Sequence, residues 1–251
     1  MLAEALFVLA VSIIVYVYAA HPIVLYVLAR FRPRQWSQAE IYPSVAVYIS
    51  AFNEEKGIGK KIQDLLDQDY EGPYIIVVAN DGSADCTAEI VRSFQDPRIV
   101  LYDFKENRGK ATMQNEIVPT LRQDVVIFSD ATAVWQRNAI RNIVRNFHDP
   151  DVGCVAVDLL FVSERDGVIE RGQSAYWRYE RFLRKYGALA RTNIVTSGAT
   201  YAIRTSLFSP IQPDIGEDLS NPVHIAMMGK RVVFDPGVIV EEVSSSTHTG
   251  E

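Results

Sequence analysis

Four acidic residues stand where chain geometry would place carboxylates at the rim of a folded domain. Asp81 and Asp130 each come at the end of an apolar run that contains several β-branched residues. Glu217 and Asp218 follow a short segment that contains both proline and glycine. A carboxylate in such a place accepts hydrogen bonds, ligates a hard divalent cation or removes a proton from a hydroxyl group. The pattern therefore indicates chemistry on a polar substrate.

Each of these acids also has a purely structural explanation. Asp81 or Ser83 can cap a helix that begins near Ala84, and Asp130 can cap the helix that follows it. Acidic residues are favoured in the first turn of a helix by the helix dipole, which would account for Glu217 and Asp218. Taken singly, the acids leave both explanations open.

If Asp130 faces a nucleotide diphosphate, the repulsion between these two negative groups must be offset. Two like charges about 4 Å apart repel by about 4 kcal/mol at an effective dielectric constant near 20. A divalent cation converts this repulsion into a bridge and neutralises charge on the leaving group. We therefore expect Mg²⁺ or Mn²⁺ as a cofactor, with Asp130 as its protein ligand.

The chain between the acids alternates strand and helix patterns, which is typical of an α/β fold with a mostly parallel sheet flanked by helices. The predicted strands are Ser44–Ile49, Tyr74–Ala79, Ile99–Tyr102, Asp124–Ser129, Gly153–Val162, Arg231–Asp235 and Val238–Val243. The predicted helices are Gly57–Gln68, Ala84–Phe94, Lys110–Leu121, Asn138–Phe147, Gly167–Leu189 and Glu217–Met228. In such sheets, ligands gather at the carboxyl ends of the strands. The polar residues after three of the strands fall at those ends.

The first 34 residues form a separate region. Ala5–Ala29 is almost entirely apolar, and its length of about 25 residues exceeds the roughly 20 that cross a bilayer. Arg30, Arg32 and Arg34 follow directly, so the positive-inside rule places the rest of the chain in the cytoplasm. We therefore predict a single-pass protein of the inner membrane. A buried or re-entrant hairpin of two short helices, broken at Pro22, is the alternative.

Composition excludes several other classes. The net charge of −6 provides no basic field for nucleic acid. Two cysteines cannot build a disulfide framework, and four scattered histidines do not have the spacing of a zinc site. Ile62 stands where a dinucleotide-binding fingerprint needs its third glycine, and Ala111 stands where a phosphate-binding P-loop needs Ser or Thr.

Six segments, in order along the chain, resemble the motifs of family 2 glycosyltransferases. They are Ile49–Glu55, Val77–Thr87, Arg108–Asn115, Ser129–Thr132, Thr196–Ala199 with Arg204, and Gly216–Asp218 with the later Gly229–Arg231 and Glu241–Glu242. Each segment is short, and the specificity comes from six in the family's order over residues 43 to 243. The resemblance is greatest to membrane-bound members that make extracellular polysaccharides.

The resemblance implies a GT-A fold, the nucleotide-diphospho-sugar transferase fold, and a role for individual residues. Ser50, Ala51, Glu54, Asp81, Lys110 and Asp130 would bind the nucleotide-sugar, with Asp130 also ligating the metal. Ser197, Gly198 and Ala199 would lie on the acceptor side. Asp218 would be the catalytic base, with Glu217 beside it. Such enzymes transfer a sugar from a UDP-sugar to a saccharide or lipid-linked acceptor in one displacement with inversion.

The sequence departs from the family pattern in three ways. Asn80 stands where many relatives have another Asp, which the fold can tolerate. Thr132 replaces the second acid of the family's metal-binding DxD motif. The sequence also ends at Glu251, where processive relatives continue with further membrane segments, which is consistent with a fragment or with an enzyme that adds a single sugar. Two rival interpretations remain: a catalytically silent, membrane-tethered nucleotide-sugar-binding subunit, and a nucleotidyltransferase on a similar fold. The expected organisation is a membrane anchor with its basic flank (1–34), a linker (35–43), the GT-A domain (44–243) and a tail (244–251).

The predicted helix Gly167–Leu189 combines two features. Tyr176, Tyr179, Phe182 and Tyr186 recur at spacings of three and four, while arginines occupy much of the remaining surface. Such a helix either packs its aromatic face in the protein core or meets membrane lipid headgroups or an acceptor.

Overall fold

A computed structural model describes residues 2–165, 168–171, 175–212 and 215–244 of the chain. The helices are α1 (Leu2–Val15), the π-helix η1 (Tyr16–Ala20), α2 (His21–Phe31), α3 (Ile58–Leu66), α4 (Thr87–Ser93), α5 (Lys110–Ile117), η2 (Val118–Thr120), α6 (Ala139–Val144), η3 (Arg145–His148), α7 (Ala175–Ala190), η4 (Thr205–Leu207) and α8 (Glu217–Met227). The strands are β1 (Val45–Ala51), β2 (Tyr74–Asp81), β3 (Ile99–Phe104), β4 (Val125–Asp130), β5 (Ala133–Trp135), β6 (Val152–Arg165), β7 (Val168–Arg171), β8 (Thr200–Arg204) and β9 (Arg231–Ser244). Nearly all of the predicted tail lies outside the described residues.

The strands form one sheet in the order β3-β2-β1-β4-β8-β6-β9-β5, with β7 paired to β6. In the first half, β3, β2, β1 and β4 are all parallel. The apolar runs of β1, β2 and β4 are buried on both faces, as expected of parallel strands between helices, whereas β3 at the edge is only partly buried. In the second half, β8 runs antiparallel to both β4 and β6, while β6 and β9 are parallel. The sheet is therefore mixed, and its parallel part lies where βαβ units alternate along the chain.

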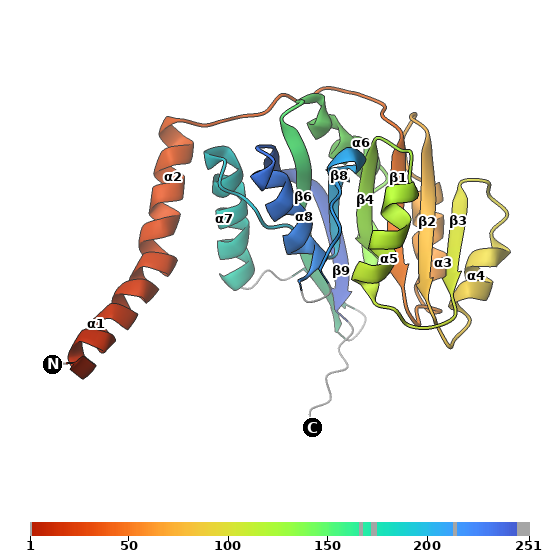
Figure 1. Ribbon diagram of the computed structural model, residues 1–251, viewed down its shortest axis with the longest axis horizontal. Coiled ribbons are helices and arrows are strands. Elements are labelled where there is room, and N and C mark those ends of the chain that lie inside the picture. The colour runs from red at the N-terminus through yellow and green to blue at the C-terminus, as the bar shows by residue number, and fades with distance from the viewer. Residues whose placement is uncertain (1, 166–167, 172–174, 213–214, 245–251) are drawn as a thin grey trace.

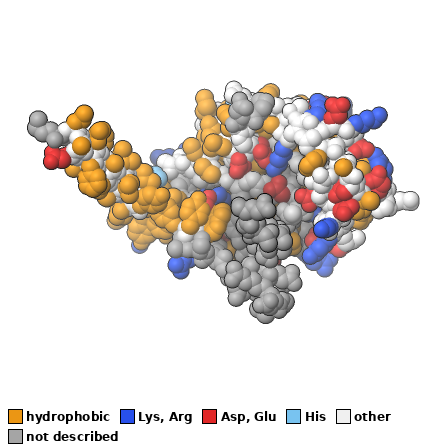
Figure 2. Space-filling view, turned by 90° about the horizontal axis from the view of Figure 1, so that it is seen from below, with side chains coloured by type: hydrophobic (Ala, Val, Ile, Leu, Met, Phe, Trp, Pro, Cys, Tyr) orange, Lys and Arg blue, Asp and Glu red, His pale blue; other side chains and the backbone are white. Residues whose placement is uncertain are grey.

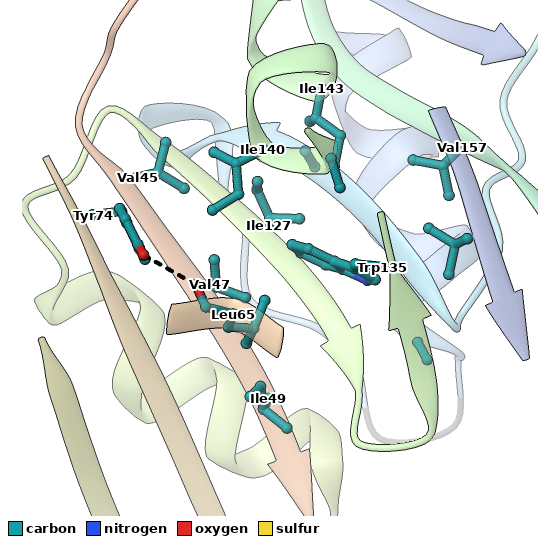
Figure 3. Close-up of a cluster of buried hydrophobic side chains, with 14 of the residues drawn as sticks. Val45, Val47, Ile49, Leu65, Tyr74, Ile127, Trp135, Ile140, Ile143 and Val157 are labelled. Carbon is teal, nitrogen blue, oxygen red and sulfur yellow. Dashed lines mark hydrogen bonds between the residues drawn. The ribbon is translucent and has the colours of Figure 1, made fainter. Parts of the chain in front are cut away.

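Helices cover both faces of the sheet (Figure 1). The larger core holds α3, α4 and α6 against one face, and the smaller core holds α5 and α8 against the other. Figure 3 shows part of the larger core, in which Trp135 lies among Ile127, Ile140 and Val157. The buried hydroxyl of Tyr74 donates to the Leu65 carbonyl across 3.0 Å, which satisfies its polar atom.

The segment predicted as one helix from Gly167 contains a strand as well. Residues 168–171 form β7, which pairs antiparallel with the end of β6, and α7 begins only at Ala175. Val168 and Ile169 are both β-branched, which favours a strand over a helix.

The N-terminal apolar region is one long helix, Leu2–Phe31, long and apolar enough to cross a membrane. The alternative hairpin with a break at Pro22 is not what the structure has. Pro22 lacks an N–H, and the wider π turn before it places the His21 N–H on the Tyr16 carbonyl. The proline therefore stands in the first turn of α2, where the missing donor is tolerated.

Candidate functional site

The parallel strands bring three of the predicted site segments to one edge of the sheet. In the ladder, Ser50 of β1 lies opposite Asp130 of β4, and Ala51 lies opposite Asn80 of β2. Parallel strands share a direction, so their carboxyl ends meet at the same edge. Ser50, Asp81 and Asp130, far apart in sequence, are therefore neighbours.

Asp81 lies at the predicted rim, but its carboxylate is buried rather than open to solvent. The residue is 4% exposed, and its carboxylate accepts hydrogen bonds from the backbone N–H groups of Arg108 (2.7 Å) and Gly109 (3.0 Å). Gly82 makes this closure possible: its φ is +70°, and a Cβ there would lie 2.6 Å from the Glu106 backbone. Asp81 therefore anchors the loop that leads to Lys110.

Lys110 begins α5 and connects two of the predicted acidic positions. Its ammonium group lies 2.9 Å from Asp130 Oδ1 and also forms an ion pair with Glu217. Burial would lower the pKa of Lys110, but the two carboxylates outweigh burial and raise it. The lysine therefore stays protonated and acts as a fixed positive charge between β4 and α8.

Asp218 lies against the predicted acceptor-side loop. The Thr196 hydroxyl donates to the Asp218 carbonyl across 2.7 Å, and a Cβ at Gly198 would come within 3.6 Å of Asp218 Oδ2. A Cβ at Gly216 would lie 2.7 Å from Asp218 Oδ1, so a larger residue there would displace the Asp218 carboxylate. Burial, and then the charge of Glu217, raises the pKa of Asp218. A partly desolvated carboxylate of raised pKa is a stronger proton acceptor than an exposed one.

Two further acids surround Asp130. Burial raises the pKa of both Glu54 and Glu242, and the charge of Asp130 adds to both shifts. The Glu54 N–H donates to the Thr87 hydroxyl across 2.8 Å, which fixes the turn after β1. Asp130 is tied to the acceptor-side loop through its own N–H, which donates to the Ala199 carbonyl. Negative charge is therefore concentrated at this edge of the sheet, around the Asp130 carboxylate.

The predicted site residues differ in exposure. Ala51, Ser197 and Ala199 are buried, so they would meet a ligand through the backbone rather than through their side chains. Lys110 and Asp130 keep about a third of their side chains exposed, at 30% and 35%. Arg204, matched to the acceptor-side loop in sequence, lies at the opposite end of β8, where its guanidinium donates to the carbonyls of Phe147 and Val152. A cavity of about 780 Å³ borders Glu54 and Thr132, on the α3 side of the turn after β4.

Two residues beside this turn were not among the predicted site residues, although Glu242 lies in one of the matched segments. Glu242 lies in β9, whose pairing with β5 brings it opposite Ala133. Lys61 is fully buried in α3, donates to the Ala133 carbonyl across 2.6 Å and lies 4.4 Å from the centre of the Trp135 ring. Burial lowers the pKa of Lys61 to about 7. A lysine on the apolar face of the predicted helix was the available signal for the second residue.

The comparisons with known proteins agree on one family. Residues 46–211 match the model for Glycosyl transferase family 2. A poly-beta-1,6-N-acetyl-D-glucosamine synthase of Staphylococcus aureus is 32% identical over 113 residues, which are 44% of this chain and 27% of the relative. A beta-monoglucosyldiacylglycerol synthase of Synechocystis sp. is 28% identical over 162 residues, which are 62% of this chain and 33% of the relative. The chain matches about a quarter to a third of the length of these two relatives.

Solved structures confirm the GT-A fold. The mannosyltransferase PcManGT from Pyrobaculum calidifontis, in complex with GDP-Man and Mn²⁺, superposes with a TM-score of 0.76 at 25% identity over 93% of this chain and 67% of that one. GalNAc-T7 with UDP, GalNAc and Mn²⁺ superposes with a TM-score of 0.60 at 16% identity over 82% of this chain and 45% of that one. Both neighbours were solved with a nucleotide or nucleotide-sugar and a divalent metal ion.

Proposed function

Because the chain belongs to glycosyltransferase family 2, we propose that it transfers a sugar from a UDP-sugar to the hydroxyl group of an acceptor, with inversion at the anomeric carbon. The observation that carries this proposal is the convergence of Asp130, Lys110 and the Glu217-Asp218 pair at one edge of the sheet. The similarity to a poly-N-acetylglucosamine synthase favours an N-acetylhexosaminyl or hexosyl donor.

The donor side would be formed by the ends of β1, β2 and β4. Ser50, Ala51 and Glu54 would meet the nucleoside, and the loop held by Asp81 would close over it with Lys110 beside the phosphates. Both oxygens of Asp81 already bind this loop, so Asp81 would act on the uridine mainly through the loop's position.

The residues around Asp130 fit a divalent cation held jointly with the donor. Magnesium commonly takes one or two carboxylates and completes its shell with water and substrate phosphates. Asp130 is partly exposed, in a field that Glu54 and Glu242 also make negative. Among the described residues, no group of three or more His, Cys, Asp and Glu side chains is arranged to hold an ion, so the phosphates would complete the shell. Bound Mg²⁺ or Mn²⁺ would supply neutralisation of the leaving diphosphate.

The acceptor side would provide the base. Asp218 would accept the proton of the acceptor hydroxyl as its oxygen forms the new bond to the anomeric carbon. The bond from that carbon to the diphosphate breaks on the opposite face, and UDP leaves with the electron pair. Lys110 would oppose the charge that develops on the diphosphate, in a site where fixed charges need little reorganisation.

We also propose that helix Leu2–Phe31 anchors the chain in the inner membrane with the GT-A domain in the cytoplasm. The apolar length of the helix and the arginines that follow it support this orientation. Surface polysaccharide or glycolipid synthesis is the process that such a location serves.

A UDP-release assay tests the proposal. The full chain in detergent micelles or vesicles is given UDP-N-acetylglucosamine or UDP-glucose, with Mg²⁺, with Mn²⁺ or with EDTA. We expect metal-dependent UDP release that Asp130→Ala reduces at least about a hundredfold, because the phosphates lose their metal bridge. Asp124→Asn, at the other end of the same strand, is the matched control and keeps activity. Full activity in EDTA would exclude the metal role.

Beside Thr132, the silent-subunit alternative has a structural observation in its favour: Lys110 already forms ion pairs with both Asp130 and Glu217. A chain that binds UDP in calorimetry but releases none from either donor would support that alternative. Release of pyrophosphate instead of UDP would indicate a nucleotidyltransferase.

A further inference from the structure

The direction of α7 determines from which end of the molecule the N-terminal helix extends. The start of α7 follows β7, which pairs with the end of β6, and the guanidinium of Arg181 lies 2.5 Å from the buried carboxylate of Asp158 in β6. Arg191, just after α7, reaches Asp151, just before β6. Helix α7 therefore runs antiparallel to β6, from the carboxyl end of the parallel strands toward their amino end.

Helix α2 lies beside α7 and runs in the same direction. The Tyr179 hydroxyl donates to the Val17 carbonyl, and the Tyr26 ring packs against Phe182 and Tyr186. Farther along, the Arg34 N–H donates to the Leu189 carbonyl. These contacts leave Leu2–Val15 clear of α7, and in Figure 1 this segment slants away from the domain, toward the side of the carboxyl ends.

The strand register places the candidate site level with the first turns of α7. Tyr201 of β8 pairs with both Ala156 of β6 and Phe128 of β4. Asp158 and Asp130, each two residues farther along, are therefore level, and Arg181 marks this level on α7. The five residues from Tyr176 to Glu180 extend about 8 Å beyond it, at about 1.5 Å per residue.

The part of the apolar helix that is clear of α7 is shorter than the hydrocarbon core of a bilayer is thick. Only Leu2–Val17 lies clear of α7, which gives about 24 Å against a hydrocarbon core of about 30 Å. Tilting the helix would reduce the depth it spans further. The bilayer must therefore extend up to the first turn of α7.

The side chains at that turn suit a membrane interface. Tyr176 is 64% exposed, and Trp177 packs edge-on against it. Arg178 is exposed and follows directly. Tyrosine and tryptophan concentrate at the headgroup level, and arginine extends its charge into the headgroups while its stem stays in apolar surroundings. Figure 2 views the molecule from this end, with apolar side chains along the helix and acidic side chains near the middle of the domain.

We propose that the first turn of α7 (Tyr176, Trp177 and Arg178) rests on the lipid headgroups and holds the Asp130–Asp218 edge toward the bilayer, so that the acceptor is a membrane lipid or lipid-linked saccharide. This inference rests on the proposed function for its substrate class. The seating on the membrane is independent of catalysis. An acceptor whose hydroxyl lies at the headgroup level would reach Asp218 without leaving the membrane.

Fluorescence quenching tests the seating. Two single-label variants of the full chain, Tyr176→Cys and Arg122→Cys, are made in a Cys86→Ser background, in which Cys154 remains buried. Both sites are exposed, but Arg122 precedes β4 at the opposite end of the sheet. In vesicles of phosphatidylcholine and phosphatidylglycerol with nitroxide-labelled headgroups, we expect a bimane label at 176 to lose most of its fluorescence and a label at 122 to keep it. Equal quenching at the two sites, quenching at neither, or quenching at 122 alone would overturn the proposal.

A partition assay tests the acceptor. Membranes from cells that produce the chain receive radiolabelled UDP-N-acetylglucosamine or UDP-glucose, with Asp218→Asn membranes as the blank, and products are separated by organic extraction. Label in the organic phase is expected. Label only on water-soluble saccharide would overturn the lipid acceptor but leave the proposed function intact. Transfer to neither phase from either donor would count against the proposed function, while the seating would still be decided by quenching.

Discussion

The two halves of the sheet position their site residues by different means. In the parallel half, each residue is delivered by its own strand: Ser50 and Asp130 end neighbouring strands in register. In the mixed half, Asp218 is held by segments distant in sequence. Tyr201 donates to the Glu217 carbonyl and accepts from Asn221, and Thr196 holds Asp218. The difference shows that the proposed donor side depends on local strand geometry, whereas the proposed acceptor side depends on contacts between separate segments.

The largest expected effect comes from removing the proposed base in the mixed half. Asp218→Asn should lower turnover by about two to four orders of magnitude, because general-base assistance is lost, while UDP affinity is kept. In the unchanged chain, turnover should fall with decreasing pH as Asp218 takes up a proton, and its raised pKa moves this limb above the range of an ordinary aspartate. UDP-release kinetics against pH, with UDP calorimetry, measure both. Loss of UDP binding in Asp218→Asn would show that the halves are not separable.

In the parallel half, a substitution is expected to lower both stability and UDP affinity. Asp81→Ala removes two charge-assisted hydrogen bonds to the loop at residues 108 and 109, and should lower the free energy of unfolding by about 3 kcal/mol. UDP affinity should fall as well, because the loop is released. Chemical denaturation and calorimetry measure these effects, with Glu89→Ala at an exposed position of α4 as the control. Unchanged UDP affinity in Asp81→Ala would contradict the anchoring role.

A smaller effect is expected where α7 joins the mixed half. Arg181→Met leaves Asp158, with its 3% exposed side chain, without its ion-pair partner, and should cost about 1–3 kcal/mol. Burial already raises the pKa of Asp158, so the loss should be smaller at low pH, where the carboxyl group is protonated. Denaturation at about pH 5 and about pH 8 tests this sign. An equal loss at both values would indicate that the ion pair contributes little.

The smallest effect per step is a pH slope in the parallel half, at most about 1.4 kcal/mol for each pH unit. Between the folded pKa of about 7 and the ordinary 10.5, unfolded Lys61 binds more protons than folded Lys61. Stability should therefore rise with pH across this window through Lys61. Lys61→Met should flatten the rise relative to the unchanged chain, and Lys60→Met, one position away in the same helix, should retain it. Denaturation midpoints at several pH values would detect the difference, and identical slopes in all three chains would contradict it.

Much of the parallel half was predictable from the sequence. Apolar runs followed by Asp81 and Asp130 indicate strands and their ends, and parallel pairing then brings the ends together. What the sequence did not show was the loop from residue 106 to 109, whose closure buries Asp81. That closure depends on the backbone conformations of Gly82 and Gly109, which only the folded chain reveals.

The mixed half was less predictable because its contacts span large separations. The place of Glu242 near Asp130 depends on the pairing of β9 with β5, which no local pattern encodes. Asp158 was a visible signal, since a carboxylate within an apolar strand needs a partner. That this partner is Arg181 depends on the direction of α7, which the sequence alone leaves open.

The bridge from Lys110 to Asp130 and Glu217 has a consequence for turnover. Before a donor arrives, the lysine would serve as an internal counter-ion for part of the negative charge at this edge. In the proposed reaction, an incoming metal–nucleotide pair would draw the ammonium from at least one carboxylate, and departing UDP would let it return. The resting enzyme would thus be reset by its own side chain after each cycle, and Lys110→Met would leave a pocket that retains free metal ions between cycles.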